Sequence, residues 1–531
     1  MYLKIFNRAT IIVLMLYSSA SAIDFIAWTA PKTISEIHLN SWLPYVAIDG
    51  NNDVLCTWRQ LNANSQRAVA LGFDASFGQW QTGANILSKS VSAQGAYEQK
   101  IAMDGQGNAW AIWRQMSGAE KVIQVSRFQP STGWWPIAQS LTLSDTTKSA
   151  YYPVISMNND GTALACWTWD DIVQAAIANS STWSVPVNLS GVDAAQVDCC
   201  INNAGLAIAV WHRFYIDHYQ IESATYVDGS WQTFDVISSG SNNAYNPHVA
   251  MDGAGNAIVV WFEQEVTGTL RVYSSKKASG SFWQPAERLS DSSANSAKFP
   301  QVAMNEKGDA IILWEQYDGT NWHIAGRNGS FFQADFNGEV AISQLGYDAF
   351  DPRVVLNVYG SAVATWTFYN AQTVKQIQVA RYDAKSKTWT NTFSQALLSN
   401  PKHDSQSAKI AINPESGNLV VAWQIFEGFN WHVQSVLGEQ ASPGIIRARQ
   451  EIHRFPLSGY VANCMQWIPV EGAVSYKIFG ADNSTLLATI PATQPLRFCD
   501  VDVAPCSVMT YYIYAVSADG TFSDPAVLTI P

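Results

Sequence analysis

Apolar and polar residues follow one another along the chain in a unit that occurs eight times. Each unit begins with an apolar, small, apolar triplet such as Val249-Ala250-Met251, which is followed by an Asp or Asn. A second apolar run then ends at a Trp nine or ten residues after that Asp or Asn. Two short apolar runs joined by a polar turn predict a β-hairpin that is crowded on both faces. The leading residues are Asp49, Asp104, Asn158, Asn202, Asp252, Asn305, Asn357 and Asn413, and the closing residues are Trp58, Trp113, Trp167, Trp211, Trp261, Trp314, Trp366 and Trp423.

The connection inside each hairpin carries a Gly six residues before the Trp in seven units, and Asn52 stands at that place in the first unit. Gly and Asn accept a positive φ, and an Asx side chain bonds to the backbone of its own turn, so these connections predict tight hairpin turns. A Ca²⁺ loop is the alternative interpretation of the acidic turns. We favour the turn, because the alternating Asp-x-Asp-x-Asp ligand spacing is missing and several of the leading residues are Asn.

Two further strands follow each hairpin. The third alternates polar and apolar residues, as at 121–127, 376–381 and 431–436, and the fourth runs from an aromatic residue to a Ser, as at 80–88 and 183–190. A period of 44 to 57 residues that carries four strands is typical of a β-propeller blade.

The two ends of the repeat array complement each other. A fourth strand, residues 28–35, precedes the first hairpin, whereas the last unit ends after its third strand near Leu437. If the N-terminal strand completes the final sheet, eight full blades result and the ring is closed. The sequence therefore predicts an all-β chain whose residues 23–440 form an eight-bladed β-propeller closed by an N-terminal strand, in preference to a linear stack.

The period breaks near Ala441, and a different pattern follows it. Trp467-Ile-Pro469, Tyr476, Tyr511 and Ser523-Asp-Pro525 together resemble a fibronectin type III domain over residues 441–531. The resemblance implies a β-sandwich, with Trp467 as the core Trp of the second strand and Tyr511 at the tyrosine-corner position. It also implies that Cys464 and Cys499 point outward from adjacent strands, so we expect a disulfide between them in preference to one between Cys499 and Cys506.

The first 22 residues have the form of a secretory signal peptide. Lys4 and Arg8 precede an apolar run over 9–17, and Ala20-Ser21-Ala22 provides a cleavage site ahead of Ile23. We therefore expect a secreted protein, extracellular or periplasmic. No later run approaches the about 18 apolar residues of a membrane span, which argues against membrane insertion.

The net charge of the chain limits its expected partners, and the spacing of its cysteines limits their expected chemistry. The formal net charge is −12, and loss of Lys4 and Arg8 with the signal makes it −14, so nucleic acid is not an expected partner. Cys56, Cys166, Cys199 and Cys200 lie inside hairpin strands without a Cys-x-x-Cys spacing, and we expect them to pack as small apolar residues.

Catalytic motifs are scarce. Residues 73–80, 226–231 and 382–389 loosely resemble the Asp-box hairpin of the sialidase superfamily, which is a structural turn in that family, and the Phe-Arg-Ile-Pro start of a sialidase is missing. The sequence has no His-Glu-x-x-His zinc motif and no Gly-x-Ser-x-Gly elbow, and its eight His show no recurring ligand spacing, so we expect no cofactor and no metal. A pair of carboxylates that hydrolyses glycosides stays an alternative, because the distance between the two carboxylates depends on the fold and cannot be read from the sequence.

The most distinctive polar residues follow the closing Trp of each hairpin. In a propeller, the loops that leave the second strands and those that enter the first strands share one rim. Aromatic faces beside amides and carboxylates on such a rim suit sugar or peptide recognition, although the same residues could simply solvate the strand ends. The candidate ligand-binding residues are Arg59, Gln60, Arg114, Gln115, Trp169, Asp171, Arg213, Tyr215, Glu263, Glu315, Gln316 and Tyr317.

Two classes of function fit this sequence. We favour a monomeric, non-catalytic binding or adhesion protein with an extracellular glycan or protein as its partner, because the repeats look nearly equivalent and an active site normally breaks repeat symmetry. The alternative is an extracellular carbohydrate-active hydrolase or lyase that uses carboxylates on the same rim.

Overall fold

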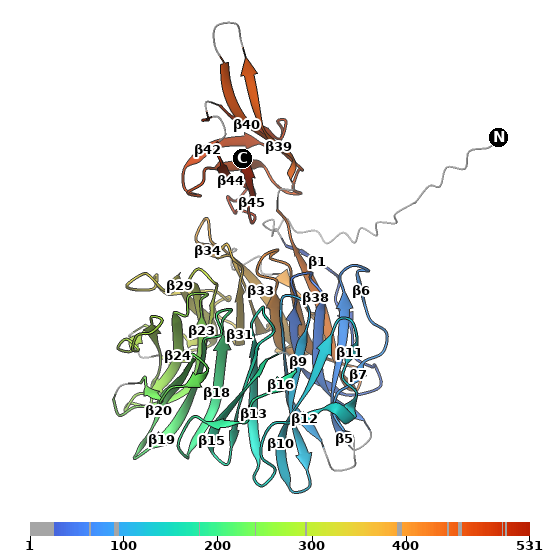
Figure 1. The fold of residues 1–531 in the computed structure, drawn as a ribbon, viewed down its shortest axis with the longest axis vertical. Coiled ribbons are helices and arrows are strands. Elements are labelled where there is room, and N and C mark those ends of the chain that lie inside the picture. The colour runs from blue at the N-terminus through green and yellow to red at the C-terminus, as the bar shows by residue number, and fades with distance from the viewer. Residues whose placement is uncertain are drawn as a thin grey trace, which may run out of the picture.

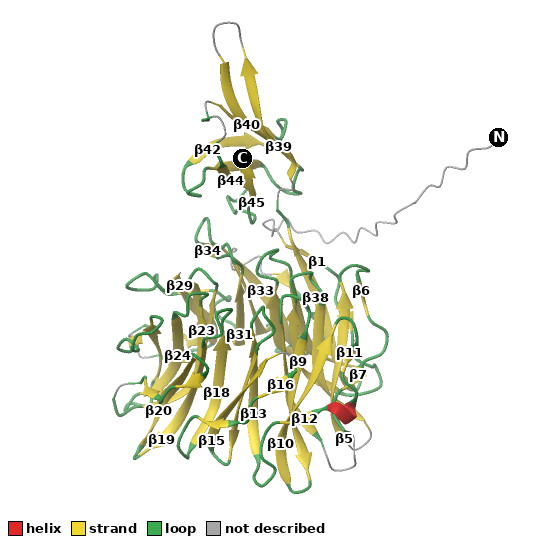
Figure 2. Ribbon diagram, in the orientation of Figure 1, coloured by secondary structure: helices red, strands yellow, loops and turns green. Residues whose placement is uncertain are grey.

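A computed structural model describes residues 26–530, except 63–64, 90–94, 180, 239, 292–294, 390–395, 443–444, 455–458, 502 and 505–506. The predicted signal peptide and Cys506 lie outside the described residues. Antiparallel strands make up the fold, which confirms the all-β prediction, and within the described ranges the only helical element is the 3-10 turn η1 (Ile137–Gln139) (Figure 2). None of the helices described there has the length and apolarity that crossing a membrane requires.

Residues 26–440 form eight antiparallel sheets of four or five strands each. The first strand of each sheet contacts the first strand of the next, and β36 of the last sheet contacts β3 of the first, so that the sheets form a closed ring (Figure 1). A ring of this kind is a β-propeller. These inner strands are β3 (Ser41–Ile48), β8 (Ala96–Met103), β13 (Ala150–Met157), β18 (Ala194–Ile201), β23 (Asn243–Met251), β27 (Ala297–Met304), β31 (Ala349–Leu356) and β36 (Ser405–Ile412).

The second and third strands of each sheet agree with the sequence pattern. The second strands are β4 (Val54–Asn62), β9 (Ala109–Ser117), β14 (Ala163–Trp169), β19 (Ala207–Tyr215), β24 (Ala257–Gln264), β28 (Asp309–Tyr317), β32 (Ala362–Tyr369) and β37 (Leu419–Glu427). The third strands are β5 (Ser65–Asp74), β10 (Glu120–Gln129), β15 (Ile172–Asn179), β20 (His218–Val227), β25 (Leu270–Lys277), β29 (Trp322–Ser330), β33 (Lys375–Asp383) and β38 (Asn430–Gln440).

The fourth strand is shorter than predicted, and in most sheets it is divided into two segments. The outer segments are β6 (Gln79–Trp80) and β7 (Asn85–Ile86), β11 (Gly133–Trp134) and β12 (Leu141–Thr142), β16 (Thr182–Trp183) and β17 (Val187–Asn188), β21 (Ser230–Trp231) and β22 (Asp235–Val236), β26 (Glu287–Arg288), β30 (Val340–Ala341), and β34 (Thr388–Trp389) and β35 (Ala396–Leu397). The Ser that ends each predicted fourth strand takes over the pairing, because its hydroxyl accepts a hydrogen bond from the third strand. Ser88 accepts from the Ala68 N–H at 2.9 Å and Ser144 from the Ile123 N–H at 2.9 Å.

The N-terminal segment belongs to the last sheet. β1 (Ile26–Trp28) and β2 (Lys32–Thr33) both pair with β38, about 400 residues later in the chain. Ser35 accepts a hydrogen bond from the Val433 N–H at 2.9 Å, just as its counterparts do in the other sheets. The pairing agrees with the strand count that predicted closure by the N-terminal strand.

The closing Trp residues form the core between sheets. All eight are fully buried, packed among the Val, Ile, Leu and Ala side chains of adjoining sheets. Large aromatic rings dominate the energetics of such cores, so each closing Trp fixes one sheet against its neighbour. Cys56, Cys166 and Cys199 are buried in the same clusters as free thiols, in agreement with their predicted packing role.

The eight Asx turns lie together on one side of the ring, which we call the Asx face. Asp104 Oδ1 accepts the backbone N–H groups of Gln106 and Asn108, and the other leading residues make equivalent bonds in their own turns. Gly107 and Asn52 both have a positive φ, as predicted. The carboxylate and amide oxygens are therefore engaged by backbone donors, which supports the turn interpretation over a Ca²⁺ loop.

Residues beyond β38 form two facing sheets. One has the order β39 (Ile445–Arg454), β40 (Gly459–Trp467), β43 (Arg497–Val501), and the other β42 (Leu486–Pro491), β41 (Ser475–Phe479), β44 (Met509–Val516), β45 (Ala526–Ile530). Trp467, Tyr476 and Tyr511 are buried between them. We call this part the C-terminal unit.

The disulfide of the C-terminal unit joins Cys464 to Cys499, as predicted. The two residues lie opposite each other on β40 and β43, so the adjacent-strand expectation is correct. The outward orientation is wrong for Cys464, which is buried.

Candidate functional site

Each inner strand is broken by a two-residue bulge near its start. In β3, for example, Trp42 pairs with Arg59 and Tyr45 with Thr57, so that Leu43 and Pro44 lie opposite the single residue Trp58 of β4. The first bulge residue has a positive φ in all eight strands, although none of the eight is a Gly. These first bulge residues are Leu43, Glu98, Tyr152, Gln196, Asn246, Phe299, Asp351 and Ser407.

The backbone strain at the bulges points to a functional role. A non-Gly residue in the left-handed region costs on the order of 1 kcal/mol or more and persists only where the surrounding structure enforces it. In five units the next residue is Pro, which further disfavours a helical conformation of the residue before it. A bulge re-aims the side chains beside it, and here it points them towards the axis of the ring.

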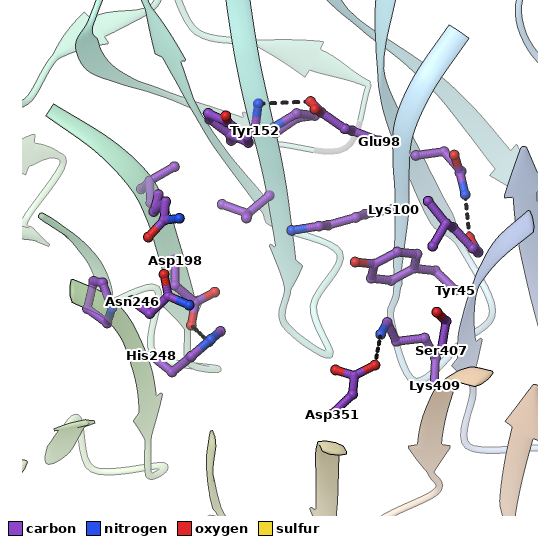
Figure 3. Close-up of a pocket in the computed structure, with 17 residues that line it drawn as sticks. Tyr45, Glu98, Lys100, Tyr152, Asp198, Asn246, His248, Asp351, Ser407 and Lys409 are labelled. Carbon is purple, nitrogen blue, oxygen red and sulfur yellow. Dashed lines mark hydrogen bonds and ion pairs between the residues drawn. The ribbon is translucent and has the colours of Figure 1, made fainter. Parts of the chain in front are cut away.

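The bulges line a pocket of about 480 Å³ on the ring axis. Seven of the eight inner strands contribute to it, and the side chains at corresponding places differ from strand to strand (Figure 3). We call it the axial pocket. Its polar lining residues are Tyr45, Glu98, Gln99, Lys100, Tyr152, Gln196, Asp198, Asn246, His248, Asp351, Ser407 and Lys409.

One side of the axial pocket holds a tyrosine among cations. Lys100 Nζ and Lys409 Nζ lie 5.8 Å and 5.4 Å from the centre of the Tyr45 ring. Burial raises the pKa of Tyr45, but Lys100, Lys409 and Arg353 together outweigh burial and bring its pKa below the ordinary value. The phenol can therefore give up its proton more easily than an ordinary tyrosine.

The opposite side of the pocket holds an acid beside a histidine. Asp198 Oδ2 lies 3.1 Å from His248 Nδ1 and accepts the Val249 N–H at 3.1 Å. Burial alone would raise the pKa of Asp198, but these hydrogen bonds and the histidine lower it below its ordinary value. The lowered pKa favours the ionised form of Asp198, which faces Tyr45 and Lys409 across the pocket (Figure 3).

Another acid of the pocket, Asp351, lies between two cations. Its carboxylate is 2.7 Å from Arg353 and 3.8 Å from Lys409, and these charges outweigh burial and lower its pKa. The Asp351 N–H donates to Glu315 Oε1 at 3.0 Å, so a residue of the preceding sheet supports the bulge. Burial raises the pKa of Glu315 to about 7.

Five of the candidate residues at the ends of the second strands are buried, namely Glu315, described above, and four others. The four others are Gln60, Gln115, Glu263 and Gln316. The Trp113, Trp261 and Trp314 indoles donate to Gln115, Glu263 and Gln316 at 3.2, 2.9 and 3.2 Å. Gln60 accepts from Arg67 Nε at 3.0 Å. These side chains thus accept hydrogen bonds from donors inside the protein, as buried polar groups must. The sequence pattern does not reveal these partners.

Arg213 also has a partner inside the protein. Its guanidinium lies 2.7 Å from Glu222, which is fully buried and accepts the Trp211 indole N–H at 2.9 Å as well. Arg213 lies 4.9 Å from the centre of the Tyr215 ring, and Tyr215 is half exposed.

The remaining candidates are spread over the face opposite the Asx face, where the inner strands begin. We call it the entry face. Trp169 packs partly buried at the end of β14, Asp171 is exposed in the following turn, and Tyr317 contacts the Trp322 ring at 5.3 Å between centres. Arg59 and Arg114 lie beside the bulges of β3 and β8, and Arg114 pairs with Glu98 of the axial pocket at 3.1 Å.

The axial pocket itself was not predicted. One signal for it is present in the sequence: Pro44, Pro153, Pro247, Pro300 and Pro352 each stand five residues before the Asp or Asn of their unit. A Pro inside a strand pattern indicates an edge or a bulge. In a predicted propeller, the repeated Pro would have marked a bulge on every inner strand.

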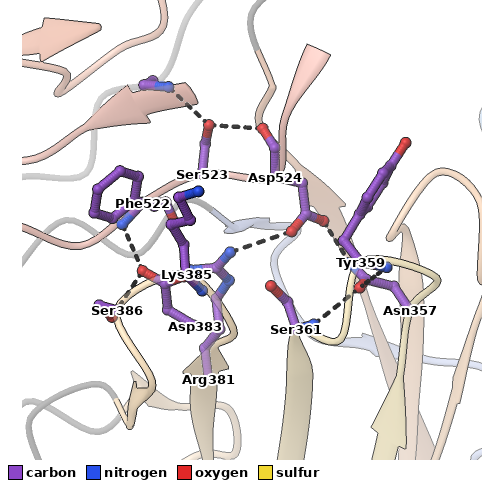
Figure 4. Close-up of polar contacts among 11 residues, drawn as sticks. Asn357, Tyr359, Ser361, Arg381, Asp383, Lys385, Ser386, Phe522, Ser523 and Asp524 are labelled. Carbon is purple, nitrogen blue, oxygen red and sulfur yellow. Dashed lines mark hydrogen bonds and ion pairs between the residues drawn. The ribbon is translucent and has the colours of Figure 1, made fainter. Parts of the chain in front are cut away.

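The C-terminal unit is anchored on the Asx face, away from the bulges. Asp524 accepts from Asn357 Nδ2 at 2.6 Å and pairs with Arg381 at 3.4 Å, and Arg381 also donates to the Phe522 carbonyl at 2.8 Å (Figure 4). The Phe522 N–H donates to Asp383 at 2.7 Å. The entry to the axial pocket therefore lies on the side opposite this anchor.

Among the residues described, no group of three or more His, Cys, Asp or Glu side chains is arranged to hold a metal ion. The axial pocket presents carboxyl, phenol, imidazole and ammonium groups.

No family model matches the chain, and no curated protein matches it. Solved structures similar to it include a protein of unknown function from Dyadobacter fermentans, with a TM-score of 0.41 and 11% identity over 78% of this chain and 100% of that one. The GH93 alpha-L-arabinofuranosidase of Fusarium graminearum has a TM-score of 0.36 and 13% identity, over 56% of this chain and 96% of that one. The NanB sialidase of Streptococcus pneumoniae has a TM-score of 0.37 and 9% identity, over 76% and 94%. TM-scores of this size carry no argument about the activity of this chain.

Proposed function

We propose that the protein is a secreted carbohydrate-active enzyme, a hydrolase or lyase, that cleaves its substrate in the axial pocket. The observation that carries the proposal is the set of reactive groups that face one another across the pocket: Asp198 and His248 on one side, Tyr45 and Lys409 on the other. Proton transfer to and from a bound sugar requires two groups on opposite sides of the pocket. One is ionised and accepts a proton, and the other has a lowered pKa and donates one.

We assign the role of base to Asp198. His248 and the Val249 N–H keep its carboxylate ionised, so it can accept a proton or, with a water molecule, activate that water. Tyr45 is assigned the role of proton donor to the leaving oxygen, since the surrounding cations lower the pKa of its phenol. Asn246 and Glu98, from the bulges of β23 and β8, are placed to hydrogen-bond sugar hydroxyls.

This proposal replaces the binding protein that the sequence favoured. The sequence favoured a binding protein because the repeats look nearly equivalent. This equivalence holds for the Trp core and the Asx turns. It fails at the bulges, where Leu43, Glu98, Asn246 and Asp351 occupy corresponding positions. The side chains at the bulges therefore differ from sheet to sheet, as the side chains of an active site do.

We further propose the domain organisation that the sequence suggested: an eight-bladed propeller over 23–440 and a fibronectin type III domain over 441–531. Eight sheets in a closed ring support the first part. The second is supported by a three-stranded sheet that faces a four-stranded one, with Trp467 and Tyr511 between them. The disulfide fits the proposed secretion.

The test is to incubate the secreted protein with a panel of neutral and acidic polysaccharides and to analyse products by mass spectrometry. Hydrolysis adds one water to each cut, whereas elimination leaves a carbon–carbon double bond that absorbs ultraviolet light. We expect turnover of at least one polysaccharide, lost in Asp198→Asn and Tyr45→Phe and retained in Asp160→Asn, an exposed acid on the Asx face. Binding without turnover would reject the enzyme and restore the binding protein.

A further inference from the structure

A row of alternating aromatic rings and cations crosses the first three sheets at the entry face. The Arg59 guanidinium lies 5.2 Å from the centre of the Trp42 ring and 5.7 Å from that of Tyr97. Arg114 follows at 5.2 Å from Tyr97 and 5.4 Å from Tyr151. We call Trp42, Arg59, Tyr97, Arg114 and Tyr151 the arginine row. Stacked rings orient a guanidinium and reduce its contact with water while leaving its edge free for hydrogen bonds.

Arg59 differs from its counterparts in charge pairing. Arg114 pairs with Glu98 at 3.1 Å and Arg213 with Glu222 at 2.7 Å. Within the part of the chain that the structure describes, no carboxylate oxygen lies within 4.0 Å of an Arg59 nitrogen, and Arg59 Nε is buried without a hydrogen-bond partner. A partly buried cation that makes no ion pair is costly, and it occurs here in a chain with a net charge of −12.

The other half of the entry face provides a comparison. Lys298 Nζ also stacks on aromatic rings, 4.1 Å from the centre of Trp322 and 5.0 Å from that of Phe299. The carboxyl group of Glu315 lies 3.8 Å from Lys298 Nζ. The two halves share the arrangement of cation and rings, but of Arg59 and Lys298 only Lys298 has an acidic side chain among the described residues within ion-pair distance.

Arg59 is accessible and close to the axial pocket. It is partly exposed, and its neighbour Tyr97 directly precedes Glu98, which lines the pocket and pairs with Arg114. Leu43 and Tyr152, two bulge residues of the pocket lining, are 38% and 49% exposed and offer apolar surface beside the row. A ligand group bound at Arg59 would thus leave the adjoining part of the ligand at the pocket entrance.

We propose that Arg59 binds the negatively charged group, carboxylate or sulfate, of an acidic saccharide whose next sugar enters the axial pocket. The proposal rests on the proposed function for the identity of the ligand as a saccharide. Arg59 donates to the anion, Trp42 and Tyr97 hold the guanidinium in place, and Arg114, already paired, adds positive potential.

The test compares charged polysaccharides with neutral forms of the same backbone. Polygalacturonate and its methyl ester probe a carboxylate, and dextran sulfate and dextran probe a sulfate. Affinities are measured by isothermal titration calorimetry for the full chain, for Arg59→Gln, for Arg59→Lys, and for Arg288→Gln as a control at an exposed arginine on β26. A melting curve for each variant verifies that it is folded.

We expect the full chain to bind at least one charged form about tenfold more tightly than its neutral counterpart, about the value of one charge-assisted hydrogen bond. Arg59→Gln should lose that preference, Arg59→Lys should keep part of it, and Arg288→Gln should keep all of it. Equal affinity for charged and neutral forms, or a preference that survives in Arg59→Gln, would overturn the proposal.

The binding readout also separates this inference from the proposed function. A charge preference at Arg59 without any product would reject the enzyme and retain the anion site. Product formation from a neutral polysaccharide, unaffected by Arg59→Gln, would reject the anion site and retain the enzyme.

Discussion

The side-chain amide of Asn413, in the last repeat, donates to the backbone carbonyl of Gly50, in the first, at 3.1 Å. The same bond links Asn158 to the Asn202 carbonyl at 3.0 Å and Asn305 to the Asn357 carbonyl at 3.1 Å. In these three turns the Asn therefore serves two purposes, because its oxygen caps its own turn while its nitrogen binds the next one. At the junction of the two ends, the ring is held on the Asx face by the same contact that joins consecutive sheets.

Deletion of residues 23–37 should lower the stability of the ring by several kcal/mol. The deletion removes β1 and β2 together with the buried side chains of Ile26 and Ile34, and it exposes the edge of β38. The measurement is thermal unfolding of the secreted protein with its signal peptide retained for export. An unchanged melting temperature would contradict closure by the N-terminal strand.

Glu315 should make the stability depend on pH. Burial raises its pKa from 4.5 to about 7, so its contribution is fully present below the unfolded-state pKa and is lost as the pH rises through 7. Lys298, Asp351 and Arg353 are the charged groups around it. Glu315→Gln keeps an acceptor for the Asp351 N–H and should gain about 2 to 3 kcal/mol relative to the unsubstituted protein between pH 5 and pH 8.

The pH series is checked by melting curves of both proteins in matched buffers. Glu439→Gln, at an exposed position on β38, is the control and should leave the pH profile unchanged. Parallel profiles for Glu315→Gln and the unsubstituted protein would show that Glu315 titrates normally.

Glu222→Ala should destabilise the ring strongly. Glu222 is fully buried and accepts hydrogen bonds from the Trp211 indole at 2.9 Å, Gln220 at 2.6 Å and Arg213. Removal of one partner from a buried ion pair costs about 3 to 5 kcal/mol, because the other charge is left unbalanced. The double variant Glu222→Ala with Arg213→Ala should lose less stability than the two single variants added together. Strict additivity would show that the two residues act independently.

Asp524→Ala should release the C-terminal unit from the ring. Asp524 is buried and bridges Asn357 and Arg381, so its loss removes two polar contacts of the anchor at once. We expect faster proteolysis between Gln440 and Ile445 and a larger radius of gyration in solution scattering. Glu471→Gln, at an exposed position in the same unit, should behave as the unsubstituted protein does. No change in either measurement would mean that Asp524 does not hold the unit in place.

The regular parts of the fold could be predicted because they repeat. A Trp that is fully buried in all eight sheets and an Asx that caps its own turn have the same surroundings in each unit, so eight copies of one pattern describe them. The split of the fourth strand was missed because the pairing there depends on single Ser hydroxyls such as Ser88, which a pattern of apolar residues does not register.

The site was harder to predict because its residues are the ones that do not repeat. Asp198, Lys100 and Tyr45 hold corresponding positions in three sheets, and only the closed ring brings them to one pocket. The amides at Gln115 and Gln316 repeat more regularly, but their regularity reflects the indole N–H that each accepts.

The pairing of β1 with β38 also constrains how the protein is made. Residues 26–33 are synthesised first, and their partner strand, Asn430–Gln440, follows about 400 residues later. During synthesis and export, the last sheet therefore stays incomplete until nearly the whole ring has emerged, and its exposed strand edge is open to pairing with other chains. A chain truncated before residue 430 lacks β38 and therefore cannot complete the ring.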